Sequence, residues 1–311
     1  MSNRWRLILS FAAVYLIWGS TYLAIRFAIE TIPPLLMAGS RFLIVGALLY
    51  AAMRGRGAAR PTGPQWAGAA LVGGLLFMGG NGGVTWAEQR VPSSLAALLI
   101  ALMPLWMVAL TWLMEGPRPT WRTTLGLALG LLGVALLIGP SELLHGERPD
   151  LLGVAVLLSS GFLWALGSLF SRRVAKPASL LMAVAMQNIA GGTLLLLAGT
   201  VGGEWPRLNL AAMSSLSLFA FLYLIIFGSI VAFSAYTFLL QNTTPANAAT
   251  YAYVNPVIAL LLGWLLGNEP MTMRVIVAAA VIISAVVLIT TRRTAVPKPV
   301  PALTTQPCES G

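Results

Sequence analysis

Long apolar runs separated by short polar breaks cover almost the whole chain. Each run is about 20 residues long, which is the length a helix needs to cross the hydrocarbon core of a bilayer. The alternating pattern of a membrane-spanning strand is absent. We therefore expect an all-α membrane protein with ten transmembrane helices. The expected spans are 7–27, 33–53, 66–86, 92–114, 121–139, 151–171, 178–199, 213–239, 246–267 and 273–291.

The second half of the chain repeats the first. At an offset of 152 residues, nine of 34 positions agree from Gln89 onward, and at an offset of 146 residues the first two spans match the sixth and seventh. The distinctive matches are Gln89 with Gln241, Pro104 with Pro256, Trp112 with Trp264, Arg122 with Arg274, Trp18 with Trp164 and Gly46 with Gly192. Internal matches in one register are typical of a duplication.

Each half holds five spans, so the two halves insert in opposite senses. The sequence thus predicts two inverted five-helix repeats, at residues 7–139 and 151–291, followed by a disordered cytoplasmic tail at 292–311. Inverted repeats are common in secondary transporters, because exchanging the conformations of the halves opens a central site to each side in turn.

Composition supports the membrane assignment. Hydrophobic residues make up 58% of the chain, charged residues 9%, and the mean hydropathy is +0.84, which excludes a soluble globular protein. The net charge of +10 does not indicate nucleic-acid binding, because the basic residues lie in short loops at span ends. We expect a lipid bilayer and a small-molecule substrate as partners, and no nucleic acid.

The distribution of basic residues predicts the orientation. With the N-terminus in the cytoplasm, thirteen Lys and Arg residues lie inside and five outside, while Arg41 lies within a span. Cytoplasmic loops of membrane proteins carry the excess of basic residues. We therefore expect a multi-pass protein of the bacterial inner membrane with both termini cytoplasmic.

Catalytic and metal chemistry find no support in the sequence. The single Cys308 and the single His145 exclude a disulfide and a Cys/His metal site. There is no phosphate-binding loop, no HExxH motif and no Ser, His and Asp set for nucleophilic catalysis. We expect no metal, no cofactor and no enzymatic activity.

Two prolines lie near the middle of equivalent spans. Pro104 and Pro256 each remove one helical hydrogen bond, and their equivalent positions favour paired hinges over ordinary membrane prolines. Beside Pro256, Tyr251 and Asn255 are four residues apart and share a helix face. This polar stripe either lines a substrate site or joins helices by hydrogen bonds.

Arg41 is the one basic residue deep inside a span. At this depth an arginine pairs, lines a wet cavity or extends its guanidinium to the interface. Glu88 is a candidate counter-charge for Arg41, or else a solvated span end, and Glu269 is expected at the interface. Trp18 and Trp164, which are repeat equivalents away from the span ends, suggest a pair of aromatic walls, or packing between helices.

Five motifs in order resemble the EamA-type permeases of the drug/metabolite transporter superfamily, and within them the YedA-like inner-membrane transporters. They are WGSTYLAIR at 18–26, IPPLLMAGSRF at 32–42, GNGGVTWAE at 80–88, FGSIVAFSAY at 227–236 and TYAYVNP at 250–256. The resemblance covers residues 11–291. It implies ten helices in two EamA repeats around a central cavity, and efflux of small organic metabolites such as amino acids.

Carried over by position, the resemblance implies cavity residues in both halves. These are Trp18, Asn81, Trp164, Tyr236, Tyr251 and Asn255. The family's Gly-Glu pair after span nine is here separated by Asn268, between Gly267 and Glu269.

The sequence therefore predicts a secondary transporter that exports a small neutral or zwitterionic metabolite by alternating access. Aromatic and amide side chains suit such a ligand. A second hypothesis is a carrier of organic anions or phosphorylated metabolites that uses Arg41. From another class, a non-transporting membrane scaffold or partner subunit is disfavoured by the polar stripe within the membrane.

Overall fold

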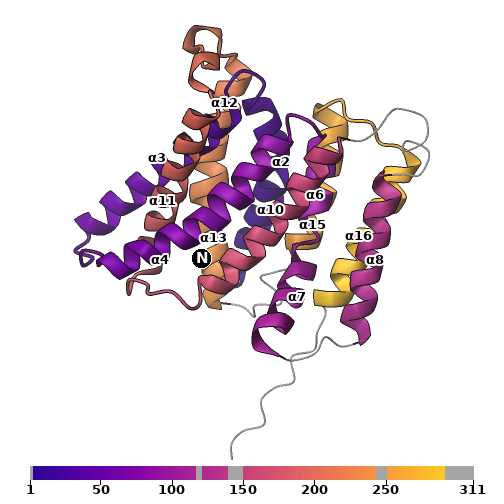
Figure 1. The fold of residues 1–311 in the computed structure, drawn as a ribbon, viewed down its shortest axis with the longest axis horizontal. Coiled ribbons are helices and arrows are strands. Elements are labelled where there is room, and N and C mark those ends of the chain that lie inside the picture. Colours follow the sequence, from indigo (N-terminus) through magenta and orange to yellow (C-terminus); the bar gives the residue numbers. More distant parts are fainter. Residues whose placement is uncertain (1–2, 117–120, 139–149, 243–250, 291–311) are drawn as a thin grey trace, which may run out of the picture.

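The computed structural model describes residues 3–116, 121–138, 150–242 and 251–290, and the regular elements in these ranges are all helices (Figure 1). The tail at 292–311, the loop containing His145 and the start of the ninth expected span lie outside the described residues. Here η marks a π-helical or 3₁₀ segment. The helices are α1 (Asn3–Ala13), η1 (Val14–Trp18), α2 (Gly19–Ala28), α3 (Pro34–Gly55), α4 (Gly63–Gly73), η2 (Gly74–Gly82), α5 (Gly83–Ala87), α6 (Ser93–Ile100), α7 (Met103–Glu115), α8 (Trp121–Ile138), α10 (Leu151–Phe170), α11 (Leu180–Val201), η3 (Trp205–Arg207), η4 (Leu210–Ala212), α12 (Ser215–Tyr223), η5 (Leu224–Val231), α13 (Ala232–Asn242), α15 (Tyr251–Leu266) and α16 (Met273–Thr290).

The prediction of an all-helical membrane protein is confirmed. Within the described ranges, seven helices are long and apolar enough to cross a bilayer. Three further apolar helical stretches, Thr124–Gly133, Val254–Leu266 and Met273–Ala285, are shorter. Large apolar side chains remain exposed along the outer faces of the bundle, including Leu113, Phe219 and Leu265. Such a surface suits contact with lipid rather than water.

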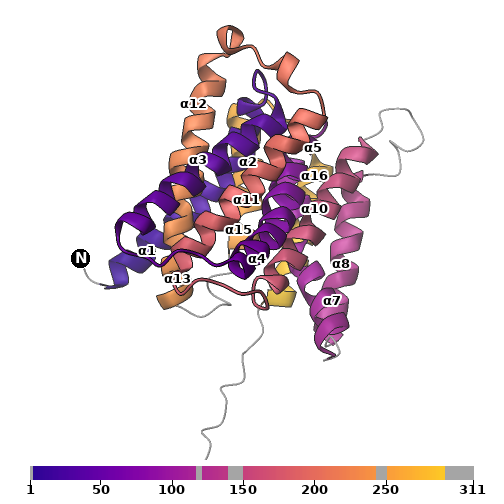
Figure 2. The ribbon, with the colours of Figure 1, turned by 60° about the vertical axis from the view of Figure 1, so that its left-hand side comes forward.

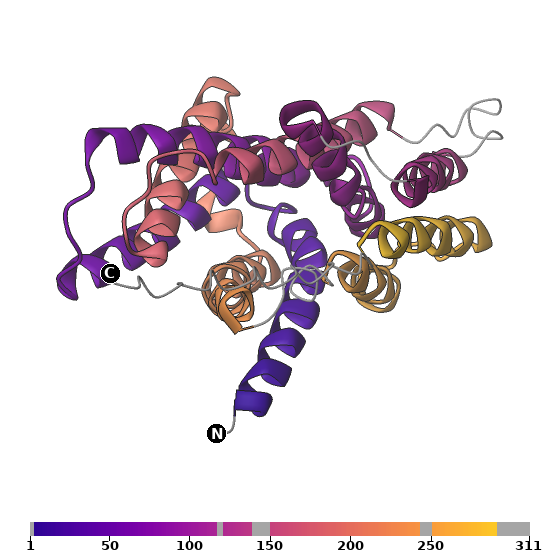
Figure 3. The same ribbon diagram turned by 90° about the horizontal axis from the view of Figure 1, so that it is seen from below.

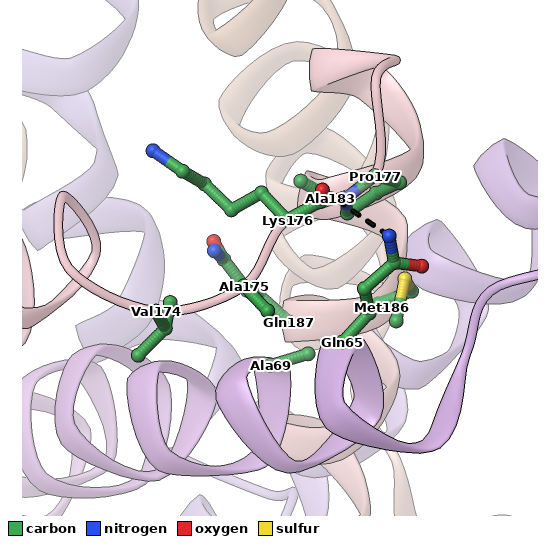
Figure 4. Close-up of a pocket in the computed structure, with 9 residues that line it drawn as sticks. All are labelled: Gln65, Ala69, Val174, Ala175, Lys176, Pro177, Ala183, Met186 and Gln187. Carbon is green, nitrogen blue, oxygen red and sulfur yellow. Dashed lines mark hydrogen bonds between the residues drawn. The ribbon is translucent and has the colours of Figure 1, made fainter.

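Loops from distant parts of the chain meet in two groups. In one group, Arg26 pairs with Glu269, Arg90 pairs with Asp150, and the Ser214 amide donates to the Thr31 hydroxyl. We call this the Arg26 end of the bundle. In the other group, Gln65 donates to the Lys176 carbonyl beside a small hollow that contains none of the expected site residues (Figure 4). We call this the Lys176 end.

Helix packing follows the duplication. Helix α3 packs along α11, α8 along α16 and α6 against α15, so the second, fifth and fourth spans each contact their equivalents. Figure 2 shows α3 beside α11, and Figure 3 shows α8 and α16 side by side at the margin of the bundle. The contacts of the first and sixth spans also recur: α2 packs on α15 and α12 of the ninth and eighth spans, as α10 packs on α6 and α4 of the fourth and third spans.

Three helices that border the centre of the bundle depart from α-helical geometry. Segments η1, η2 and η5 are π-helical turns within the first, third and eighth expected spans. At the offset of 152, η2 corresponds to residues 226–234 and overlaps η5, so equivalent spans carry the same irregularity. π-helical turns are rare in proteins, and those that occur often lie at functional sites.

The fourth span is interrupted where a midspan proline predicts it. Helix α6 ends at Ile100, and α7 begins at Met103 with Pro104 in its first turn. At the junction, Leu102 N donates to Leu99 O and Leu105 N to Leu102 O, which are tighter i to i+3 bonds. Pro256, by contrast, lies inside a continuous α15. The geometry is therefore asymmetric, and hinge motion at either proline stays a prediction.

Candidate functional site

Three of the expected site residues form one aromatic cluster. The ring centroids of Trp18 and Tyr236 are 5.1 Å apart, those of Trp18 and Tyr251 are 5.1 Å apart, and those of Tyr236 and Tyr251 are 5.6 Å apart. The rings come from η1, α13 and α15, which lie in both halves of the chain. Tilted and edge-to-face pairs at these separations are favourable. We call these three residues the aromatic cluster.

The π-helical turn η5 holds Trp18 in place. The indole Nε1 of Trp18 donates to the carbonyl of Gly228, 3.1 Å away. A Cβ atom on Gly228 would lie 3.2 Å from the Thr21 side chain and 3.1 Å from an Arg41 nitrogen, so a larger residue there would make these two side chains shift. The irregular segment thus brings a backbone acceptor to the indole of another span.

Arg41 lies on the far side of the same turn. Its side chain is buried, and Nε donates to the Ser229 hydroxyl at 2.8 Å. Its guanidinium carbon also lies 4.9 Å from the centre of the Phe42 ring. Arg41 is therefore turned inward to the eighth span and does not extend to the interface. The structure brings it to within one residue of the carbonyl that binds Trp18.

Asn255, one helical turn after Tyr251 of the aromatic cluster, has a side-chain acceptor without a hydrogen bond. Only 7% of the residue is exposed, and its side-chain Oδ1 has no hydrogen-bond partner. Helix α15 approaches closely here, since a Cβ atom on Gly19 would lie 3.3 Å from the Asn255 carbonyl oxygen. A buried amide oxygen without a partner is costly. Asn255 Oδ1 is therefore an unsatisfied buried acceptor in this structure.

The remaining expected residues, Asn81 and Trp164, lie at a second contact between the halves. Asn81 belongs to η2, and a Cβ atom on its neighbour Gly80 would lie 2.7 Å from Trp164 Cε3. Trp164 on α10 therefore packs on a π-helical turn, as its repeat equivalent Trp18 does. Trp164 is not part of the aromatic cluster, and the expected pair of aromatic walls stays a prediction.

The structure overturns both expectations for Glu88. Among the described residues, no salt bridge joins Glu88 to Arg41, and Glu88 is only 5% exposed, so it is neither the counter-charge nor a solvated span end. Glu269 lies between α15 and α16 at the Arg26 end, where an interfacial residue is expected, but only 4% of it is exposed. Asn268 explains this: its positive φ of 50° ends α15 in a left-handed turn that directs Glu269 inward.

Glu269 holds the start of α6. Its carboxylate accepts hydrogen bonds from Ser93 N at 2.7 Å, Ser93 Oγ at 2.7 Å and Ser94 N at 2.9 Å, and pairs with Arg26 at 2.7 Å. Burial alone would raise the pKa of Glu269, but the hydrogen bonds from Ser94 and Ser93 outweigh it and hold the pKa below its usual value. A negative charge also suits a helix N-terminus.

A second ion pair closes the Arg26 end at the loop before α10. Asp150 accepts from Arg90 at 2.8 Å and from the Gly153 amide at 2.7 Å, so it caps α10. The hydrogen bond from Arg90 and the bond from the Gly153 amide hold the pKa of Asp150 below its usual value. Within the described part of the chain, no group of three His, Cys, Asp or Glu could hold a metal ion.

Comparison with known proteins matches this arrangement to one family of transporters. The model of the EamA-like transporter family matches residues 5–139 and again residues 151–291. The chain is similar to the uncharacterized inner membrane transporter YedA of Escherichia coli K12, with 42% identity over 84% of this chain and 82% of the relative. It is also similar to a probable amino-acid metabolite efflux pump of Salmonella typhimurium LT2, with 25% identity over 83% and 86% of the two chains.

A solved crystal structure shares the fold. The TM-score is 0.61 at 22% sequence identity, and the match covers 92% of this chain and 96% of the other. At this identity the likeness bears on the fold alone.

Proposed function

The chain belongs to the EamA-like transporter family, and we propose that it is a secondary exporter of a small neutral or zwitterionic organic metabolite, such as an amino acid or a related compound. One observation carries the proposal. Aromatic rings from three spans meet within the bundle, and Tyr251 lies one helical turn from Asn255, whose amide oxygen is buried and has no hydrogen-bond partner. Rings provide an apolar contact face, and a free amide oxygen accepts a hydrogen bond from an ammonium or amino group.

We further propose that the fold is ten spans in two inverted repeats that work by alternating access. The two matches to the family and the recurring helix contacts support the duplication. In the state described here the three rings of the aromatic cluster contact one another. A ligand must therefore separate or cover them, which fits a site that opens as the halves move. The break between α6 and α7 is a candidate hinge for this motion.

Export should depend on Asn255. We expect Asn255→Ala to lower export of the transported metabolite by at least about fivefold, because one hydrogen bond to a buried group contributes roughly 1–3 kcal/mol. The measurement is a mass-spectrometric profile of the culture medium from overproducing cells against an empty vector. Asn242→Ala, at an exposed residue at the end of α13, is the matched control. The proposal fails if overproduction changes neither extracellular metabolites nor resistance to toxic analogues.

A second candidate function is the carriage of organic anions or phosphorylated metabolites. The buried guanidinium of Arg41, held by Ser229 next to the aromatic cluster, favours it. In the same export profile, Arg41→Ala with the exposed Arg56→Ala as its control separates the two candidates. An anionic cargo that is lost only with Arg41→Ala would replace the first proposal by the second.

We propose that the Arg26 end faces the periplasm and the Lys176 end, with both termini, faces the cytoplasm. The excess of basic residues at the Lys176 end and the inner-membrane relatives support this orientation. The expected result is that a membrane-impermeant thiol reagent leaves Cys308 unlabelled in intact cells whose outer membrane has been opened, and labels it after lysis. A Leu210→Cys variant in a Cys308→Ser background, 74% exposed in the loop before α12, should be labelled in both. The reverse pattern would invert the orientation.

A further inference from the structure

Glu88 is a buried carboxyl group without a partner. It follows the last residue of α5 at the Arg26 end, only 5% of it is exposed, and neither side-chain oxygen accepts a hydrogen bond. A carboxylate removed from water without a partner is very unfavourable, so such a group is held as the neutral acid. The function proposed above leaves Glu88 without a role.

Three ionisable side chains surround Glu88. Tyr22 and Arg26 reach it from successive turns of α2, and Glu269 reaches it from the turn after α15. Of the other helices that pack on α5, η2 and α10 contain no ionisable residue. Arg41 of α3 carries a positive charge, and its guanidinium is held by the Ser229 hydroxyl. Helix α6 has no ionisable residue, and Arg90 on the same loop pairs with Asp150. The charged side chains that act on Glu88 are thus Arg26 and Glu269.

Arg26 forms its ion pair with Glu269 and not with Glu88. Its guanidinium pairs with Glu269 at 2.7 Å, and Glu269 also holds the amides of Ser93 and Ser94. Burial raises the pKa of the Glu88 carboxyl well above its usual range, the charge of Glu269 raises it further, and Arg26 acts in the opposite direction. While Arg26 stays with Glu269, Glu88 keeps its proton.

Loss of that proton would change the electrostatic interactions among Glu88, Glu269 and Arg26. An ionised Glu88 competes with Glu269 for the single guanidinium of Arg26 and repels the Glu269 carboxylate. Either effect weakens the attachment of Glu269 to the start of α6. Helix α6 ends at Ile100, just before the break in the fourth span, and motion of α6 relative to α7 at this break is part of the proposal.

We propose that Glu88 is the proton-binding site of this transporter: it takes up a proton from water as the Arg26 end closes and returns it to water as that end opens. The proposal rests on the transport function proposed above and adds the coupling ion to it. The step forms or breaks one O–H bond at the Glu88 carboxyl and needs no other reactant. In the structure described here the Glu88 side chain is buried, and it is the neutral acid.

The first test observes the proton itself. Infrared difference spectra of the purified full-length protein in lipid, recorded between neutral and alkaline pH, should show loss of the C=O stretching band of a protonated carboxyl group. We expect this band to be absent in Glu88→Gln and to persist in Glu30→Gln, an exposed glutamate at the same end. The proposal is overturned if the wild-type protein has no such band at neutral pH, or if the band survives in Glu88→Gln.

The second test observes the opening. Ala97 on α6 is 1% exposed, so Ala97→Cys in a Cys308→Ser background should resist a membrane-impermeant thiol reagent while the Arg26 end is closed. Because thiolate formation alone speeds labelling as the pH rises, each rate is divided by that of the exposed Leu210→Cys variant at the same pH. We expect this ratio to rise several-fold from pH 6 to pH 9 with Glu88 present and to stay low at both pH values with Glu88→Gln. A pH response that is unchanged by Glu88→Gln would contradict the proposal.

These measurements are separate from the proposed cargo. Neither test needs a substrate, so a Glu88 band and a Glu88-dependent opening together with a negative export profile would refute the exporter proposal alone. Conversely, export that depends on Asn255 but is unaffected by the proton gradient and by Glu88→Gln would refute the proton site alone.

Discussion

Replacing Glu269 with alanine should lower the free energy of unfolding by about 3 kcal/mol. The substitution leaves the amides of Ser93 and Ser94 buried without an acceptor, and each unsatisfied buried group costs roughly 1–3 kcal/mol. Loss of the partner of Arg26 adds less, because the Arg26 side chain is 35% exposed and therefore partly solvated. The measurement is thermal unfolding of the purified protein in detergent, where a decrease of ~5–10 °C is expected.

Acidity provides an internal check on this result. The pKa of Glu269 lies below its usual value in the folded protein, so its contribution to stability is complete at neutral pH and is lost as the pH falls through that lowered value. The difference between the wild type and Glu269→Ala should therefore shrink on acidification. Glu30→Ala, at an exposed residue of the same end, should change the melting temperature by less than about 2 °C. Equal melting temperatures for Glu269→Ala and Glu30→Ala would show that α6 is held in another way.

The contrast between Glu269 and the spans shows what sequence patterns can and cannot predict. Hydropathy reports burial in lipid over about 20 residues, and it placed a helix in each of the ten expected ranges. The burial and hydrogen bonding of Glu269 depend on a single left-handed residue, Asn268, and on the position of the N-terminus of α6 opposite it. The second condition is a tertiary relation, which an apolar pattern does not record.

The aromatic cluster was accessible to sequence reasoning only in part. The pairing of Tyr251 with Asn255 follows from helical spacing, and Trp18 was singled out as an aromatic residue away from the span ends. Their contact with Tyr236 needed the fold, and so did the Gly228 carbonyl that η5 presents to Trp18. The π-helical turns depend on packing between the halves, so no local propensity predicts them.

The burial of Glu88 is a second feature that the sequence does not predict. Its position at a span end favours a solvated carboxylate, because the sequence gives no sign that α2 and the turn after α15 cover it. Tyr22, a further neighbour, lies within the WGSTYLAIR motif, and only the fold brings it beside α5. The sequence alone therefore does not distinguish a solvated polar residue at a helix end from a buried one such as Glu88.

The largest loss of folded protein is expected at the contact between α3 and α11. A Cβ atom on Gly192 would lie 2.7 Å from Leu43 N and 2.9 Å from Gly39 O, and one on Gly46 would lie 2.7 Å from Ile189 N and 2.9 Å from Ala185 O. The two contacts are reciprocal, because the offset of 146 relates Gly46 to Gly192, Leu43 to Ile189 and Gly39 to Ala185. Both obstacles are backbone atoms, so a change of side-chain rotamer cannot relieve either clash.

Gly192→Val should therefore separate the two helices and destabilise the protein by more than the ~1–3 kcal/mol typical of an overpacked core. We expect little monodisperse protein by size-exclusion chromatography in detergent, and a smaller loss of the same kind for Gly192→Ala. Gly55→Ala is the matched control, because a Cβ atom at this position of α3 meets nothing within 4 Å and alanine favours the helix. Since Arg41 lies between Gly39 and Gly46 on the same stretch of α3, its hydrogen bond to Ser229 should also be weakened in any Gly192→Ala protein that folds. Wild-type yield and melting temperature in Gly192→Ala would show that folding does not need the close approach of α3 and α11.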